Sequence, residues 1–518
     1  MMKRYLAIIA VLLTASITAC AMQPVKKQAR KTDAVDSTAV TLQQAQAGNA
    51  AAQNTVGLWY YMGKDSIRQD YKQALQWWAR SAKQDNADAI GNMALCYQLG
   101  RGTERDSVMA VKLYESAVKK GNKNVIPQHE KLSDKGNLFS SLLLRECYVK
   151  GIGVDKSPQK ATEYLEKAAK AGHESSQYTL GLQLLNGKQP EKAAAWFKKA
   201  AAQGNAGATY YYGNMLHKGL GVKEDKPSGI ALLKQAAAKD FVMANYQLGL
   251  ICKDGDGVTK DSVKAFAYIK KAAWQGNPNA QWVLGTMYLN GEGVAQDYYF
   301  AAQWLAEQAL ITHKKEINEL LKADNEGPFS QYLMGLRKYQ VDKDYEAAID
   351  CFKKVEKEGN IEGTTMLAVC LANKDYKKRN LKKAIKQLTK AAATSPAAQY
   401  YLSAMYETGT GVDKDDAKAV ELLKSAADKG VAYAQCKLGD RYMKGNGVEQ
   451  NATKAALLYL DAEAQNHLTP QSAKNLAECY KQKQSFLPDP QNADKRVEQL
   501  GKQKANGNLI NLLKLLGK

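Results

Sequence analysis

The sequence has few of the histidines and cysteines that a metal site or a disulfide framework would need. It has only five histidines in 518 residues, and none pairs with another His, a Cys or a carboxylate at metal-ligand spacing. One of its eight cysteines belongs to the N-terminal motif described below, and the odd remainder argues against a closed set of disulfides. We therefore expect no metal, no cofactor and no disulfide scaffold.

Sequence signatures of catalysis are also missing. Two S-x-x-K segments, residues 116–119 and 157–160, have the spacing found around the acylating serine of penicillin-recognising enzymes, but the S-D-N and K-T-G elements that accompany it there are absent. The G-x-G segments follow predicted helices, whereas a phosphate-binding loop follows a strand. We expect a protein that is not an enzyme.

Charge of one sign is in excess: 73 Lys and Arg stand against 52 Asp and Glu, a net charge of +21 that becomes +19 once Lys3 and Arg4 leave with a signal peptide. The lysines suit the solvated side of helices, which is the interpretation we favour. The alternative is a surface that attracts anionic lipid headgroups or anionic cell-wall polymers. No compact basic stretch with interleaved aromatics occurs, so we expect no nucleic-acid partner.

The longest apolar run lies at the very start of the chain, at residues 5–13, behind the cations Lys3 and Arg4. It is too short to span a bilayer and has the layout of a signal peptide, which we predict over residues 1–19. No later stretch is apolar enough to predict a membrane span.

The predicted signal peptide ends in Ile17-Thr18-Ala19-Cys20, which resembles the lipobox of bacterial lipoproteins. The resemblance implies cleavage before Cys20 and lipidation of that residue, and the acyl chains would hold the protein on a membrane. Residues 20–48 would then form a tether. Ala21 and Met22 lack the aspartate of inner-membrane retention signals, and no acidic cluster follows, so we expect a cell-envelope location on the outer membrane, facing the periplasm.

Internal repetition dominates the remainder of the sequence. Three successive units begin at Asn205, Phe241 and Asn277, which are 36 residues apart. About eleven or twelve such units cover residues 49 to roughly 490, each too small to bury its apolar face alone. The frame recurs at Asn49, Asn86, Asn137, His173, Gly327, Asn360, Ser395 and Val431, and partially near Thr469.

Each unit predicts two helices joined by a tight corner. Ala280, Leu284, Gly285 and Tyr288 fall on one helical face, and the glycines of residues 291–294 (Gly-Glu-Gly-Val) then permit the positive φ angles that reverse the chain. An Asp and a second helix follow, which closes with Ala-Ala before a Gly. We predict as core side chains the cysteines that take the place of Met215, Met287 and Met405 in other units, namely Cys96, Cys147, Cys370 and Cys479.

This pattern, A-x-x-x-L-G-x-x-Y-x-x-G-x-G-V followed by D-x-x-K-A and A-A-x-x-G, resembles the Sel-one-like repeat, a relative of the tetratricopeptide repeat. The resemblance covers nearly the whole chain after the tether. It implies an all-α fold, a right-handed α/α superhelical solenoid of about 36-residue helix-turn-helix repeats with the first helices on the concave side. Members of the family typically act as adaptors in protein assemblies.

The repeats fall into three groups, at residues 49–121, 137–311 and 327–468. The intervening residues 122–136 and 312–326 lack the corner glycines and the alanine pair, and we predict hinges there. Residues 469–518 form a partial repeat and a C-terminal helix with an apolar Leu and Ile face at 509–516. We expect this helix to cap the last repeat, and the alternative is that it adheres to a membrane.

Aromatic residues recur on the helix face opposite the predicted core. They either line a concave groove that binds a partner or pack between adjacent first helices, and large aromatics with polar tips suit both roles. We predict a non-catalytic, membrane-tethered scaffold that binds a protein or peptide in this groove; the alternative is a peptidoglycan or lipopolysaccharide binder. The predicted groove residues are Tyr178, Tyr211, Tyr246, Trp282, Tyr332, Tyr400 and Tyr401.

Overall fold

The computed structural model describes residues 31–64, 67–309, 315–317, 319–320, 327–465, 467–482, 487 and 493–502. The predicted signal peptide, Cys20 and the apolar C-terminal face lie outside these residues. The chain divides into two compact units, Met1–Leu180 and Gly181–Lys518. Within the described ranges the regular structure is helical, and no helix is both long and apolar enough to cross a membrane.

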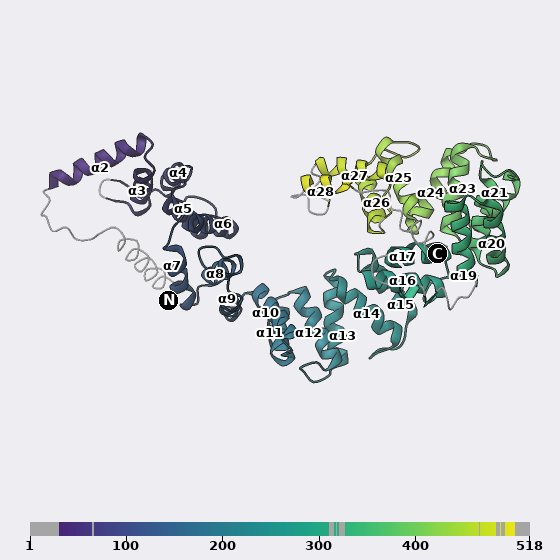
Figure 1. Ribbon diagram of the computed structural model, residues 1–518, viewed down its shortest axis with the longest axis horizontal. Helices are drawn as coiled ribbons and strands as arrows, with labels where there is room; N and C mark the ends of the chain where they lie inside the picture. Colours follow the sequence, from purple (N-terminus) through teal and green to yellow (C-terminus); the bar gives the residue numbers. More distant parts are fainter. Residues whose placement is uncertain are drawn as a thin grey trace. The chain divides into compact units, whose positions relative to one another are not determined.

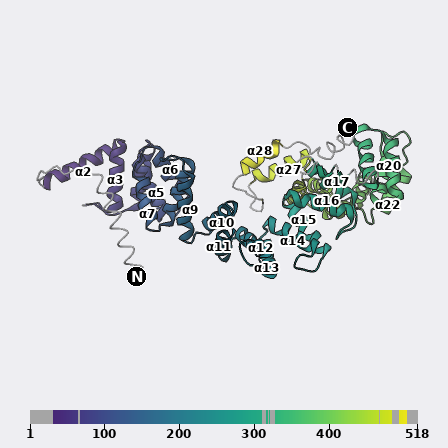
Figure 2. The ribbon, with the colours of Figure 1, turned by 60° about the horizontal axis from the view of Figure 1, so that its bottom comes forward.

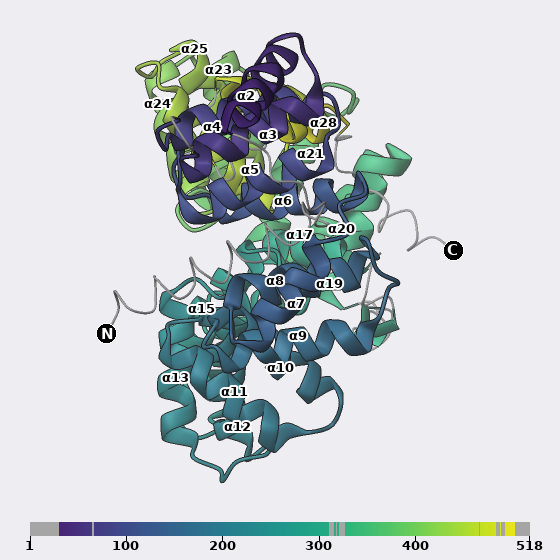
Figure 3. The same ribbon diagram turned by 90° about the vertical axis from the view of Figure 1, so that its left-hand side faces the viewer.

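The first unit is a row of helices that pack in chain order, as Figure 1 and Figure 3 show. Short corners join the two helices of each pair, which makes them neighbours in space. The last helix of the row continues into the second unit. The helices are α2 (Lys31–Gln46), α3 (Ala50–Met62), α4 (Tyr71–Ala82), α5 (Ala87–Leu99), α6 (Ser107–Lys119), α7 (Val125–Asp134), α8 (Leu138–Lys150), α9 (Pro158–Lys170) and α10 (Glu174–Asn186).

The second unit repeats the same arrangement, with one π-helical turn, η1 (Lys338–Asp342), at a corner. Its helices are α11 (Pro190–Ala202), α12 (Ala206–Lys218), α13 (Lys226–Ala238), α14 (Val242–Asp254), α15 (Ser262–Trp274), α16 (Pro278–Asn290), α17 (Tyr298–Ala309), α19 (Pro328–Arg337), α20 (Tyr345–Lys357), α21 (Ile361–Ala372), α22 (Leu381–Ala391), α23 (Pro396–Thr408), α24 (Asp416–Asp428), α25 (Ala432–Lys444), α26 (Ala452–Ala464), α27 (Pro470–Lys481) and α28 (Ala493–Lys502).

Side-chain caps fix where the helices begin. Asn205 precedes α12, and its side-chain oxygen accepts a hydrogen bond from the Ala208 amide at 2.7 Å. Asp261 precedes α15 and accepts from the Lys264 amide at 2.9 Å. Such caps satisfy amides that have no partner within the helix. The Asn or Asp at these two points of most units therefore sets the 36-residue frame, and the all-α repeat fold predicted from the sequence is confirmed.

The two corner glycines have different roles. Gly291 ends α16 with φ +69°, the left-handed conformation expected there. Gly293, with φ +72°, lies against the preceding repeat, where a Cβ atom would come within 2.0 Å of the Ser262 carbonyl oxygen. Only glycine fits both this conformation and this approach. The sequence predicted the first role, and the structure adds the second.

Large side chains of the second helices pack against small residues of the first helices. A Cβ on Gly285 of α16 would lie 2.8 Å from Leu305 of α17. Ala280, Leu284, Gly285 and Tyr288 are all buried, as predicted. Cys96, Cys147, Cys370 and Cys479 are buried free thiols, which confirms their assignment to the core.

Residues 122–136 contain a regular helix, α7, although they lack the repeat signature. Its Val125 and Ile126 are buried, and His129 hydrogen-bonds to the Ser140 hydroxyl at 2.8 Å. The segment therefore packs into the first unit, and the predicted hinge there stays a prediction. Of residues 312–326 only 315–317 and 319–320 are described, so the second predicted hinge lies mostly outside the described residues.

Candidate functional site

The predicted groove residues of α12, α14 and α16 lie partly open on their helices. Tyr211 stacks on Phe197 of α11 with ring centroids 5.1 Å apart, and it also contacts Tyr210 edge to face. Tyr246 and Trp282 are half-buried, as is Tyr178 in the first unit. Tyr211 thus packs between adjacent repeats while keeping part of its ring exposed.

The predicted groove residues of α19 and α23 lie deeper. Tyr332 is 1% exposed and belongs to the core, while Tyr400 and Tyr401 are half-buried and contact each other edge to face at 5.4 Å. Tyr332 and Tyr401 come together at one pocket. Sequence reasoning gave these residues the same status as Trp282, and the structure separates them by depth.

Helix α17 explains the difference in depth. Its Tyr299 stands two residues after the capping Asp, where the second helices of two other repeats carry the exposed Val108 and Val263. Tyr299 is instead 9% exposed, because it faces the first helices of the repeats that follow. Figure 2 shows the second unit running from α11 out to α20 and α22 and then turning back toward α27 and α28.

Other contacts hold the curl in place. The Asn360 side chain, at the start of α21, donates to Gln296 Oε1 at 3.3 Å, across 64 residues of sequence. A Cβ on Gly430 would lie 3.3 Å from the ring of Trp274, at the end of α15. The second unit therefore closes on itself over several repeats rather than extending as an open row.

The curl encloses a pocket of about 70 Å³ between α17, α19, α21, α23 and α25. One water needs roughly 10–15 Å³ of such space, so the pocket could hold about five waters or one extended side chain. It reaches the surface beside Tyr433, which is 39% exposed and stands 5.9 Å from the His467 ring. The main lining residues are Tyr299, Gln303, Tyr332, Met366, Tyr401, Tyr433 and His467.

Two carboxyl groups lie near the pocket, that of Asp297 half-buried and that of Glu362 buried. Asp297 caps α17 and accepts from the Phe300 amide at 3.0 Å, and Glu362 in the first turn of α21 is fully buried. Neither forms an ion pair with a described residue. The Glu362 carboxyl oxygens form no hydrogen bond with a described residue, although the Ser395 hydroxyl is near.

Burial dominates the electrostatics of this interior. It raises the pKa of Asp297 to about 6, although hydrogen bonds from the Phe300 and Tyr299 amides lower that pKa. Burial, and after it the Asp297 carboxyl, raise the pKa of Glu362 well above its usual range. The pKa of Tyr332 is also raised, first by burial and then by Glu362. The interior thus carries two acids without a compensating cation among the described residues.

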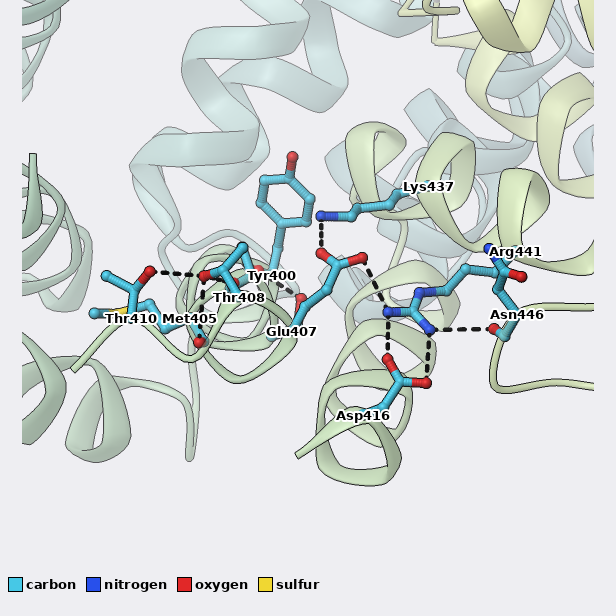
Figure 4. Close-up of polar contacts among 11 residues, drawn as sticks. Tyr400, Met405, Glu407, Thr408, Thr410, Asp416, Lys437, Arg441 and Asn446 are labelled. Carbon is cyan, nitrogen blue, oxygen red and sulfur yellow. Dashed lines mark hydrogen bonds and ion pairs between the residues drawn. The ribbon is translucent and has the colours of Figure 1, made fainter. Parts of the chain in front are cut away.

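An ion-pair network holds one wall of the pocket. Figure 4 shows the Arg441 guanidinium of α25 between Glu407 of α23 and Asp416 of α24, at 2.9 Å from each carboxylate. It also donates to the Asn446 carbonyl oxygen at 3.1 Å, while Lys437 pairs with the other oxygen of Glu407. Bidentate charge-assisted contacts of this kind fix geometry as well as energy.

The network fixes α25, which carries Tyr433, against α23, which carries Tyr401. Sequence analysis missed it, although a signal was present: Arg441 stands at the core position that Met287 and Met405 occupy in other repeats. A charged residue at such a position requires buried partners.

A row of 36-residue helix pairs whose neighbours share one core defines an α-helical repeat scaffold. The Sel1 repeat model matches most of the chain, so the protein belongs to the Sel1 repeat family. The predicted family resemblance is thereby confirmed. The matched segments are residues 50–86, 87–122, 144–173, 175–205, 206–241, 242–277, 278–307, 328–360, 396–431 and 432–467.

Solved structures similar to the chain include two proteins of this repeat type. One is c5321, a protective antigen of uropathogenic Escherichia coli with an SLR fold, at 26% identity over 92% of this chain and 97% of that one, with a TM-score of 0.34. The other is a Sel1 repeat protein from Oxalobacter formigenes, at 23% identity over 82% and 99% of the two chains, with a TM-score of 0.33.

Proposed function

We propose that this protein is a non-catalytic scaffold that holds a protein or peptide segment against the first helices of its second unit. The observation that carries the proposal is the succession of partly open aromatics Tyr211, Tyr246 and Trp282 on α12, α14 and α16. Aromatic side chains give large contact area with little loss of conformational entropy. Membership of the Sel1 repeat family supports it, because such repeats typically serve as protein-interaction scaffolds.

We further propose that the scaffold works in the bacterial cell envelope, tethered to the outer membrane on its periplasmic side through a lipid on Cys20. Support comes from the sequence, in which residues 17–20 resemble a lipobox behind a signal peptide. The tether would confine the scaffold to one surface and raise the effective concentration of partners there.

Crosslinking in intact cells, with affinity recovery and mass spectrometry, tests both parts. We expect one protein partner to be recovered with the native chain and lost in the double variant Tyr246→Ala, Trp282→Ala. Tyr406→Ala, a half-buried aromatic elsewhere in the same unit, is the matched control. Unchanged circular dichroism and melting must accompany the loss. Recovery of the same partner with the double variant would contradict the groove, and membrane retention of Cys20→Ser would contradict the anchor.

A second function, binding of an anionic envelope polymer, is favoured by the corner before α22. In place of G-x-G-V it carries Lys374, Lys377, Lys378 and Arg379, and the helix adds four exposed lysines at 382, 383, 386 and 390. Among these only Lys378 forms an ion pair between described residues, with Glu346 in the first turn of α20. The result is a dense basic surface.

Ionic strength separates the two functions. Binding of peptidoglycan or lipopolysaccharide through this surface should weaken steeply as salt is added, because exposed charges are screened over about 10 Å at 0.1 M salt. Capture of a peptide by aromatic groups should change little. If the polymer is bound here, replacing Lys382, Lys383 and Lys386 by Gln should abolish cosedimentation of the protein with the polymer. If the scaffold proposal is right, the same variant should still crosslink to its protein partner.

A further inference from the structure

The pocket enclosed by α17 has a chemistry that the scaffold proposal does not use. Its lining includes the four tyrosines Tyr299, Tyr332, Tyr401 and Tyr433, and the Tyr433 ring contacts the His467 ring at 5.9 Å. The faces of aromatic rings carry negative partial charge and attract cations. No Lys or Arg is among the described lining residues.

The polar groups around the pocket call for a donor with positive charge. The side-chain oxygen of Gln303, which lines the pocket, is buried without a hydrogen-bond partner among the described residues. A buried acceptor without a donor is costly, so a ligand that donates there gains that energy back. Asp297, half-buried at the cap of α17, and Glu362, buried in the first turn of α21, add two acids that form no ion pair with a described residue.

We propose that this pocket binds an alkylammonium group, such as the side chain of a lysine in a protein segment held by the scaffold. An ammonium group donates up to three hydrogen bonds, which suits the Gln303 oxygen, and its charge suits the tyrosine faces and the Asp297 carboxylate. The pocket volume of about 70 Å³ admits an unbranched alkyl chain with its terminal nitrogen. The lysine assignment rests on the proposed scaffold function, whereas the ammonium chemistry does not.

Met366 provides a local probe of occupancy, because it lines the pocket. The intact protein would be labelled with ¹³C at its methionine methyl groups, and the Met366 signal would be assigned by its absence in Met366→Leu. The ligands are n-butylammonium chloride, a peptide Gly-Lys-Gly blocked at both ends, and n-butanol as the neutral analogue of equal length.

We expect n-butylammonium to shift the Met366 signal at concentrations where n-butanol does not. At neutral pH Asp297→Asn should weaken this binding about tenfold, since it removes a charge near the pocket with little change of shape. Asp225→Asn is the matched control, because Asp225 caps α13 in the same way as Asp297 caps α17 but is exposed. Circular dichroism would verify that each variant is folded.

Equal shifts from n-butanol, no shift from n-butylammonium, or unchanged affinity in Asp297→Asn at neutral pH would each overturn the proposal. If the amine binds and the blocked peptide does not, the source is a free amine rather than a protein lysine. These outcomes are independent of the crosslinking experiment. If n-butylammonium does not bind but a partner is still crosslinked through Tyr246 and Trp282, the pocket proposal fails and the scaffold function is supported.

Discussion

Asp297 allows the curl of the second unit to be tested through the pH dependence of stability. It caps α17 as Asp225 caps α13, and in sequence the two are equivalent. Burial raises the pKa of Asp297 from 3.8 to about 6, whereas hydrogen bonds from Ser228 lower the pKa of the exposed Asp225. Because Asn is as good a helix cap as Asp, replacement by Asn isolates the charge in both places.

The expected effect of Asp297→Asn follows from the pKa difference. The folded protein holds this proton more tightly than the unfolded chain, so the native protein loses stability as pH rises from about 4 to about 6 and none beyond. A shift of about two pKa units corresponds to about 3 kcal/mol at neutral pH, and the difference falls below about 1 kcal/mol near pH 4. Asp297→Asn should therefore stabilise the protein at neutral pH.

Urea unfolding followed by circular dichroism at pH values between about 4 and 7.5 measures this difference. The Asp297→Asn variant should gain stability over the native protein as pH rises, whereas Asp225→Asn should not. The reasoning would be refuted if Asp297→Asn were no more stable than the native protein at neutral pH. It would equally fail if both Asn variants behaved alike, because α17 would then be as open as α13.

Three further changes test other parts of the structure. Gly293→Ala should cost at least about 3 kcal/mol in urea unfolding, because it adds a backbone clash to a positive φ. Gly276→Ala, at a positive φ with open space around it, should cost about 1–2 kcal/mol. Equal costs would mean that the corner does not contact the preceding repeat closely. Arg441→Met should cost under about 1 kcal/mol, since Glu407 keeps its ion pair with Lys437 and the Asp416 side chain is 45% exposed. Arg441→Ala should cost about 2–4 kcal/mol through the cavity that it leaves. A large loss of stability in the Met variant, seen by thermal melting, would show that the charge itself is needed. Burial lowers the pKa of His129 from 6.5 to about 4, so the native protein should lose up to about 3 kcal/mol as pH falls through this interval, and His129→Gln should remove that part of the loss in acid titrations of unfolding.

The local architecture could be predicted from the sequence because each part of it is encoded within one repeat. The two helices of each unit, the first corner glycine and the buried cysteines depend mainly on neighbours within about one repeat, and the structure shows them as expected. The second corner glycine was visible as a motif, but its contact with the preceding repeat was not.

The candidate site was less accessible to sequence analysis. Tyr332 and Trp282 hold the same position in their repeats, yet one is buried beside the pocket and the other is half-exposed. Arg441 was recognisable as a charge at a core position, but its partners Glu407 and Asp416 stand 34 and 25 residues away on other helices.

The repeat pattern determined the helices and their order, since the residues that form them recur in most units. Only the tertiary structure decided that α17 turns its Tyr299 toward α19, α21, α23 and α25. That arrangement joins side chains from helices of several repeats, which the pattern of a single repeat does not specify. It is the reason why Asp297 and Asp225, alike in sequence, differ in burial and in pKa.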